Sequence, residues 1–242
     1  MQTSNQPPDL IPQPDLASQP AQAHQPALVS PPASVSPPAL APLPITRHPS
    51  ALPLPRILTG NRVVVRQYVD ADAKALFDGV DESRVALKHW MPWVDSVRSV
   101  DDRLDYIRKC QAQFLAPHAD LVYGMFDVSG HYLGGTGLHR INWNTPSFEI
   151  GYWLRLTAHG QGFVTQAIGL LTTACFETLG AARVEIKCDA ANEKSANVPK
   201  RLGFNQEAVL RCERRNAAGV LSDSLVFALT WDDWRERLQI VQ

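Results

Sequence analysis

The chain has 242 residues, of which 45% are hydrophobic, and its formal net charge is −1. This length suits one ordinary domain with a tail. The near-neutral charge argues against nucleic acid or an anionic membrane surface as a partner. No apolar run reaches the roughly 18 to 20 residues that a membrane span needs, and the N-terminus lacks the pattern of a secretory signal. We therefore predict a cytoplasmic protein.

The four cysteines lie far apart in the sequence and form no CxxC pair. This spacing matches neither a zinc site nor a redox-active disulfide. Reduced thiols are the simplest interpretation, and we expect no metal.

Composition changes abruptly near residue 56. Residues 1–55 hold 15 of the 19 prolines and only three charged side chains. Such a stretch favours polyproline II and cannot bury a core. We predict a disordered, proline-rich tail over residues 1–55 and one globular domain over 56–242. The alternatives are that the tail is a ligand for a proline-binding partner, or that translation starts further downstream.

Valine-rich residues 62–69 begin the domain and alternate as a strand does. Two short helices are expected next, at about 71–79 and 82–89. Asp70 and Asp81 would serve as their N-caps.

Proline sets the next two boundaries. Pro92 excludes a regular helix from residues 90–96. Residues 101–115 have apolar side chains near helical spacing, and Pro117 ends that helix.

The remaining segments alternate between strand and helix patterns, and hairpin turns are expected at Ser129–Gly130 and Asn216–Gly219. Gly203 should close the short helix, and Trp231 and Trp234 should face inward from the last one. The predicted elements are strands at 121–128, 132–141 and 147–154, a helix at 163–179, a strand at 182–189, a helix from 195, strands at 207–215 and 220–230, and a helix at 231–238. Together they predict a mixed α/β fold, one sheet with helices on both faces.

A glycine-bearing loop joins the strand that ends at Leu154 to the long helix that begins at Phe163. Gly160 and Gly162 lie in this loop. A strand that leads through such a loop into a helix presents unpaired backbone N–H groups and a partial positive charge, which together favour an anion. The loop is neither a Walker loop, since no GK[ST] follows, nor a dinucleotide fingerprint, since GxGxxG is absent. The remaining candidate ligand is a pyrophosphate that backbone amides hold without a metal.

The order GYWL, HGQGFVTQA, ARVEIKCDAANEKSANVPKRLGF and EAVLR resembles the GNAT superfamily of acyl-CoA-dependent N-acetyltransferases, in particular the RimJ/RimL type that acetylates ribosomal-protein N-termini. The resemblance spans about residues 58–236, including WMPW at 90–93 and the D-x-x-x-F-x-L strand that starts at Asp223. It implies a GNAT fold, with a mixed, mostly antiparallel sheet of about seven strands splayed in the middle. It also implies acetyl-CoA as co-substrate and makes a homodimer plausible.

The family's phosphate motif, Q/R-x-x-G-x-G/A, falls on residues 159–164, with His159 and Val164 as departures from the pattern. Amide donors do not depend on the side chain, so the resemblance still implies pyrophosphate binding there. It implies pantetheine binding along the strand that ends near Leu156. The residues implied to bind the donor are Tyr152, Leu154, Leu156, His159, Gly160, Gln161, Gly162, Phe163, Val164, Thr165, Asn192 and Ser195.

Asn192 and Ser195 form the N-x-x-S that the family places beside the pantetheine arm. An Asn before a helix is also a common N-cap, so capping and ligand binding both remain open. In the resembling enzymes the serine hydrogen-bonds the CoA sulfur, which implies that Ser195 stabilises the leaving thiolate.

Glu149 is the most pointed catalytic candidate, because it interrupts an otherwise apolar strand where an unpaired carboxylate would be costly to bury. Acetylation of an amine requires an ammonium to lose its proton, and this carboxylate could accept it directly or through a water. The alternative is a structural ion pair with Arg140 or Arg155.

The residues that bind the acceptor amine are less clearly indicated by the sequence. Trp90 and Trp93 are either core plugs or walls of the acceptor pocket, and His139 is either an assistant to Glu149 or a surface residue. Asp223 either contacts the substrate amine or pairs with Arg211.

We therefore predict direct transfer of an acetyl group from acetyl-CoA to a primary amine in a ternary complex. The expected acceptor is a protein N-terminal α-amine of the ribosomal type. A small-molecule amine (a polyamine, an antibiotic or a toxin) is the first alternative. A catalytically silent acyl-CoA-binding module, suggested by His159 and Val164, is the second.

Deletion of residues 1–55 should leave the melting temperature and the affinity for CoA nearly unchanged, because a proline-rich tail adds nothing to the core. Thermal unfolding and calorimetric titration of the full chain and the truncated chain test this. Loss of folding on truncation would contradict it.

Overall fold

The computed structural model describes residues 55–114, 120–216 and 218–240. The predicted tail, apart from Pro55, lies outside the described residues, and so does Pro117 with its predicted helix stop. No helix within these ranges is long and apolar enough to cross a membrane.

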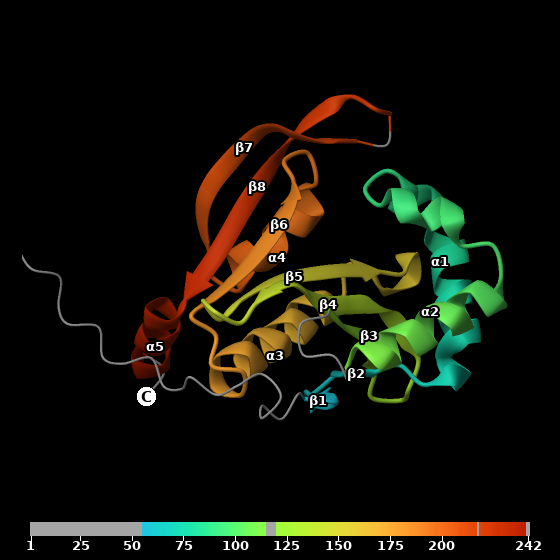
Figure 1. Cartoon of the computed structure of the whole chain (residues 1–242), viewed down its shortest axis with the longest axis horizontal. Coiled ribbons are helices and arrows are strands. Elements are labelled where there is room, and N and C mark those ends of the chain that lie inside the picture. Colours follow the sequence, from blue (N-terminus) through green and yellow to red (C-terminus); the bar gives the residue numbers. More distant parts are fainter. Residues whose placement is uncertain (1–54, 115–119, 217, 241–242) are drawn as a thin grey trace, which may run out of the picture. The chain divides into compact units, whose positions relative to one another are not determined.

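One eight-stranded sheet organises the domain, in the order β1-β2-β3-β4-β5-β6-β8-β7 (Figure 1). Every neighbouring pair is antiparallel except β5 and β6, which are parallel. The sheet exceeds the predicted seven strands because residues 57–59 pair with β2 as a short edge strand. The strands are β1 Ile57–Thr59, β2 Val63–Gln67, β3 Leu121–Asp127, β4 Tyr132–Asn142, β5 Ser147–Leu154, β6 Arg183–Asp189, β7 Asn205–Arg215 and β8 Leu221–Thr230.

Helices cover both faces of the sheet, as predicted. Alternation along β3 shows the division: Tyr123 and Met125 belong to the core cluster that includes α3, whereas Phe126 belongs to the cluster that includes α1 and α2. The period of two in a strand sends neighbouring side chains to opposite faces. The helices are α1 Ala73–Lys88, α2 Val100–Gln113, α3 Phe163–Glu177, α4 Glu193–Arg201 and α5 Trp231–Ile240.

The two short helices predicted between residues 71 and 89 are wrong, because α1 runs unbroken through that segment. Its buried side chains include Leu76, Val80 and Leu87, which keep helical spacing across the expected break. Asp81 lies on the exposed face and pairs with Arg84, 3.1 Å away. Asp70 caps nothing either, since it lies inside a single 3₁₀ turn that precedes α1.

Local signals predicted the turns correctly. The Asp127 carboxylate accepts hydrogen bonds from the amides of Ser129 and His131 at the β3–β4 turn. Pro92 begins a 3₁₀ segment rather than an α-helix. Gly203, with φ of +66°, follows the last turn of α4, a conformation that favours glycine.

The predicted splay in the middle of the sheet lies between β5 and β6. These strands are paired only over residues 147–149 of β5, and Figure 1 shows β6 and β8 diverging from β5 beyond that point. The edge of β5 that faces β6 is therefore open from Ile150 onward. An open edge offers backbone donors and acceptors to another chain or to a ligand.

The C-terminal helix is held to the domain by aromatic packing. Trp231 and Trp234 pack against the main core, as predicted. The Trp234 ring stacks on Phe176 of α3, with centroids 5.3 Å apart and an interplanar angle of 15°.

Replacement of Phe176, which is 1% exposed, with alanine should lower the free energy of unfolding by about 3–5 kcal/mol, because it removes a buried ring and leaves a cavity. Val85→Ala is the control, since Val85 is 91% exposed and a surface change should cost within about 0.5 kcal/mol. Urea unfolding of both variants measures the difference. Equal losses would contradict the packing described for α5.

Candidate functional site

A cleft of about 1360 Å³ lies where β5 parts from β6. Its walls come from β5, the start of α3, α4, α1 and the β1–β2 turn. The volume exceeds that of an ordinary small-molecule pocket, so an extended ligand can be accommodated. The predicted site residues that line it are Trp90, Tyr152, Leu154, Leu156, His159, Gly160, Gly162, Val164, Thr165, Asn192 and Ser195.

The glycine loop has the geometry of an anion site. Gly160 and Gly162 have φ angles of +74° and +78°, and beyond their chain neighbours no described atom lies within 4 Å of the position that a Cβ would take at either one. Glycine is needed there for the left-handed backbone, and it also leaves the approach to the amides open. Gly162 is the N-cap of α3 and has no side chain to satisfy the first-turn N–H groups. An anion in the cleft would meet those donors and the positive end of the helix dipole.

Two predicted binding residues of this loop direct their side chains elsewhere. Gln161 Nε2 donates to the carbonyl of Thr157 at 3.1 Å. The Phe163 ring lies under the guanidinium of Arg62, whose Cζ is 4.7 Å from the ring centroid. Neither residue lines the cleft, so any contact with an anion there is limited to backbone amides. The His159 side chain does line the cleft, and its Nε2 donates to the carbonyl of Leu154 at 3.2 Å.

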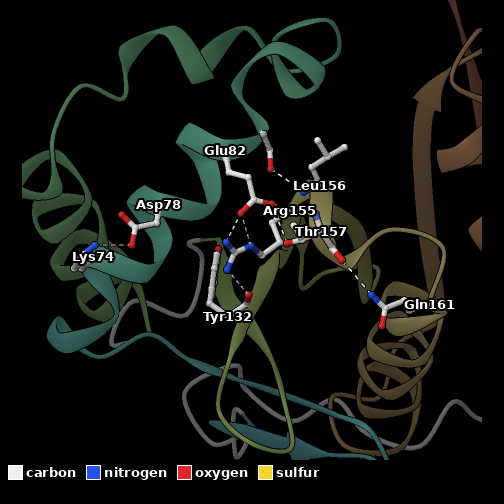
Figure 2. Close-up of polar contacts among 9 residues, drawn as sticks. Lys74, Asp78, Glu82, Tyr132, Arg155, Leu156, Thr157 and Gln161 are labelled. Carbon is white, nitrogen blue, oxygen red and sulfur yellow. Dashed lines mark hydrogen bonds and ion pairs between the residues drawn. The ribbon is translucent and has the colours of Figure 1, made fainter.

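Helix α1 anchors the segment between β5 and the glycine loop (Figure 2). The Glu82 carboxylate accepts hydrogen bonds from the Arg155 guanidinium, from the Thr157 amide at 3.0 Å and from Thr157 Oγ1 at 2.9 Å. The hydrogen bonds from Arg155 are the main reason that the pKa of Glu82 falls to about 2. Glu82 could not be identified from sequence, because nothing in a helical Asp-Glu-Ser stretch indicates a partner more than 70 residues away.

The neighbouring contact involves Leu156, one of the residues implied to bind the donor. Ser83 Oγ accepts a hydrogen bond from the Leu156 amide at 2.8 Å. That amide is therefore occupied and does not present itself to a pantetheine chain. Leu156 contributes its half-exposed side chain to the cleft wall instead.

Asn192, Ser195 and Tyr152 form a connected group on the β5–α4 side of the cleft. Asn192 is the N-cap of α4, and its side chain accepts from the Ser195 amide at 3.1 Å. Ser195 Oγ donates to the Tyr152 hydroxyl at 3.3 Å, and that hydroxyl donates to the Ser195 carbonyl at 2.9 Å. Burial raises the pKa of Tyr152, so its hydroxyl stays protonated near neutral pH. Two hydroxyl groups thus line the cleft side by side.

A second, smaller cavity of about 380 Å³ lies against β4, β5 and the helices α1 and α2. Trp93 and His139 line it. Met91, Tyr152 and Trp153 line both cavities, so the two meet along β5. Each of the two predicted tryptophans therefore forms part of a cavity wall, Trp90 in the large cleft and Trp93 in the small cavity.

Glu149 lies on β5 at the last position that pairs with β6, directly opposite His139 of β4. Its Oε2 atom is 3.1 Å from Arg140 Nη1, without the alignment of a hydrogen bond. The ion pair with Arg140 is one of the two structural alternatives that the sequence offered. The other is excluded, because Arg155 pairs with Glu82. Glu149 lines neither cavity, although His139 and Gly151, its neighbours on the sheet, line the smaller one.

Asp223 lines neither cavity, and its carboxylate does not pair with Arg211. It accepts a hydrogen bond from the Cys212 amide at 2.8 Å, where Cys212 has a φ of +53° in a bulge of β7. The position of Asp223 therefore indicates a structural role at this bulge. The charged residues of this region that do line the cleft are Lys194 and Arg201 of α4, which sequence analysis did not single out.

Comparison with known proteins gives consistent matches. The family model described as acetyltransferase (GNAT) domain matches residues 62–205. The protein YdaF of Bacillus subtilis (strain 168) is 28% identical over 176 residues, which cover 71% of this chain and 93% of YdaF. The ribosomal protein uS5-alanine N-acetyltransferase of Escherichia coli (strain K12) is 26% identical over 183 residues, 73% of this chain and 92% of that enzyme. The structure of RimL, a ribosomal L7/L12 α-N-protein acetyltransferase in complex with coenzyme A, has a TM-score of 0.67 at 22% identity and covers 73% of this chain and 99% of RimL. The match to RimL establishes a common fold.

Glu82→Gln should lower the free energy of unfolding by about 1 kcal/mol at pH 7, a value reduced from that of a buried charged hydrogen bond because water partly screens the pair. The folded-state pKa lies near 2 and the ordinary value is 4.5. The stabilisation is therefore complete above about pH 5 and is lost as the pH falls towards 2. Urea unfolding at several pH values should show a constant gap between wild type and variant above pH 5 that narrows below it.

The control for this prediction is Asp78→Asn, in the Lys74–Asp78 pair of the same helix (Figure 2). The side chains of this pair are 75% and 45% exposed. That change should cost less than about 0.5 kcal/mol. A gap for Glu82→Gln that does not depend on pH, or that equals the control, would contradict the anchoring role.

Proposed function

Because the chain belongs to the acetyltransferase (GNAT) domain family, we propose that it transfers an acetyl group directly to the N-terminal α-amine of a ribosomal protein. The chain is an N-acetyltransferase that uses acetyl-CoA as its donor. The observation that best supports the donor site is the cleft at the parting of β5 and β6, with the glycine loop and the α3 N-terminus in its wall. The ribosomal acceptor is supported by the relative that acetylates ribosomal protein uS5.

Acetyl-CoA would need three features in the cleft: an anion site for its pyrophosphate, an extended wall for its pantetheine arm, and positive charge for its remaining phosphate. The amides from Gly160 to Thr165 would hold the pyrophosphate without a metal. The open edge of β5 would pair with the amide groups of the pantetheine arm, which orients the thioester. Lys194 and Arg201 add positive charge along α4, where the remaining phosphate of the donor can be neutralised.

The reaction replaces the thioester C–S bond with a new bond between carbon and the acceptor nitrogen. The acceptor ammonium loses one proton before its nitrogen attacks the thioester carbon. The sulfur leaves with the electron pair of the broken bond, and the nitrogen then gives up a second proton, which ends on the thiolate to form the thiol of free CoA. Glu149 is proposed to take the proton, through His139 or a water, since His139 is its cross-strand neighbour and lines the small cavity. The Arg140 side chain is 66% exposed, so its pairing with Glu149 can yield to a substrate.

The leaving thiolate is proposed to be stabilised by the hydroxyl pair of Ser195 and Tyr152. Both line the large cleft, and both carry protons at neutral pH. A hydrogen bond to a developing negative charge stabilises it more strongly than a bond to a neutral group. The two cavities meet at Tyr152, which is consistent with donor and acceptor being bound together.

A small-molecule amine is the second candidate acceptor, and the shape of the smaller cavity favours it. That cavity is about 380 Å³ and its walls include five tyrosine and tryptophan side chains, whereas a protein N-terminus needs a trough that continues beyond the first residues. None of the described residues that line it is acidic, which argues against a polyamine.

Glu149→Gln should lower kcat/KM by about 100-fold or more, the usual contribution of a positioned base, with little change in acetyl-CoA affinity. Thiol release from acetyl-CoA should be measured with a panel of N-terminal peptides and small amines. Glu177→Gln, an exposed change at the end of α3, is the control. Equal turnover by wild type and Glu149→Gln with every acceptor would refute the assigned base. If wild type binds CoA but turns over no acceptor, the proposed reaction is wrong.

A further inference from the structure

Arg103 of α2 is a buried cation. The residue is 9% exposed and lines the smaller cavity. The guanidinium lies 5.0 Å from the centroid of the Tyr106 ring, and Nε has no hydrogen-bond partner. No carboxylate within the part of the chain that the structure describes forms an ion pair with it.

Arg66, another arginine in this part of the domain, differs from Arg103 in having a carboxylate partner. Arg66 lies 2.7 Å from Asp72 and 3.7 Å from the Phe126 ring centroid, so it has both a carboxylate and an aromatic partner. The acid next to Arg103 in sequence, Asp102, is engaged with the amides of Arg98 and Ser99 at the start of α2. Residues 115–119, which follow α2, contain no acidic residue.

An unpaired buried charge is costly, because the protein interior solvates it poorly. Burial is also the main cause that lowers the pKa of Arg103, although an arginine remains protonated at any physiological pH. A structural role alone would favour a methionine or leucine of similar size at this position. A ligand that enters the cavity would therefore supply the counter-ion that the Arg103 guanidinium lacks.

The other walls indicate what such a ligand carries. Tyr68, Trp93, Tyr106 and Trp153 contribute aromatic surface, which suits an apolar or aromatic group. The cavity also touches Tyr152, where it meets the large cleft. A molecule held by Arg103 at one end thus extends towards the place where the acetyl group arrives.

We propose that the smaller cavity binds an acceptor amine that also carries a carboxylate or phosphate group, with Arg103 as counter-ion and the aromatic walls around the apolar part. The inference rests on the proposed function and defines its substrate class. Two sources share this chemistry: a small amino acid-like molecule, or a protein N-terminus with an acidic side chain in its first residues.

Kinetics with matched acceptors test the proposal. The acceptors are phenylalanine and phenylalaninamide, and two peptides that begin Ser-Phe-Glu and Ser-Phe-Gln. Arg103→Gln should lower kcat/KM for the acceptors with the added carboxylate by about 10- to 100-fold, the value of a charge-assisted contact. It should change kcat/KM for their amide counterparts by less than about twofold. Comparison of variant with wild type for each acceptor cancels differences in amine basicity.

Arg108→Gln is the matched control, because Arg108 lies on the same helix but is 58% exposed and pairs with Asp70 at the surface. It should leave all four values unchanged. An advantage for phenylalanine assigns the small-molecule source, and an advantage for the glutamate peptide assigns the protein source. A carboxylate preference that persists in Arg103→Gln overturns the proposal, and so does the absence of a preference in wild type.

A binding measurement separates this inference from the proposed function. Calorimetry should show that wild type binds N-acetylphenylalanine more tightly than N-acetylphenylalaninamide, and that Arg103→Gln does not. If no acceptor releases thiol but this binding difference is present, the proposed reaction fails and the anionic subsite stands. Equal binding of the two ligands by wild type, or no binding of either, overturns the subsite. A lower melting temperature of Arg103→Gln with unchanged ligand preference also overturns it, since it assigns Arg103 to packing.

Discussion

The parting of β5 from β6 is the constraint on which the rest of the structure depends. The two strands share only three pairs, from Ser147 to Glu149, and parallel strands this weakly joined separate as the sheet twists. Separation leaves the backbone of β5 without a partner on one side, in a place where water or a ligand has to satisfy it. The large cleft follows from that one interruption, and Glu149 is the last residue of β5 before it.

The far end of β5 cannot be left equally free, because the glycine loop follows it directly. Helix α1 fixes it through Glu82 and Ser83, which together satisfy Arg155, Leu156 and Thr157. The open edge therefore lies between two fixed points, the short β6 pairing and the α1 anchor. Such a frame holds residues 155–157, which lead into the glycine loop, so less ordering has to accompany binding.

Local features of this site could be predicted from sequence, whereas its long-range pairings could not. The β5 strand, the glycine loop and the capping by Asn192 each depend on neighbouring residues, and the structure has them within a residue or two of the expected positions. The break at Asp81 was wrong because an aspartate on the exposed face of a helix has the same local signature as an N-cap. Glu82 and Arg103 were missed because their roles depend on residues or cavities brought close only by the fold. The choice between Arg140 and Arg155 as the partner of Glu149 could not be made from sequence for the same reason.

Side chains on the two faces of the sheet belong to different core clusters, and neighbouring residues of β5 contribute to both. Tyr152 packs with the cluster that includes α3, and its neighbour Trp153 packs with the cluster that includes α1 and α2. In a continuous sheet, groups on opposite faces are separated by the strands themselves. Here β6 no longer covers the edge of β5, so a donor and an acceptor can meet around that edge. The proposed ternary complex then requires no covalent relay through the protein, and none of the four cysteines lines either cavity.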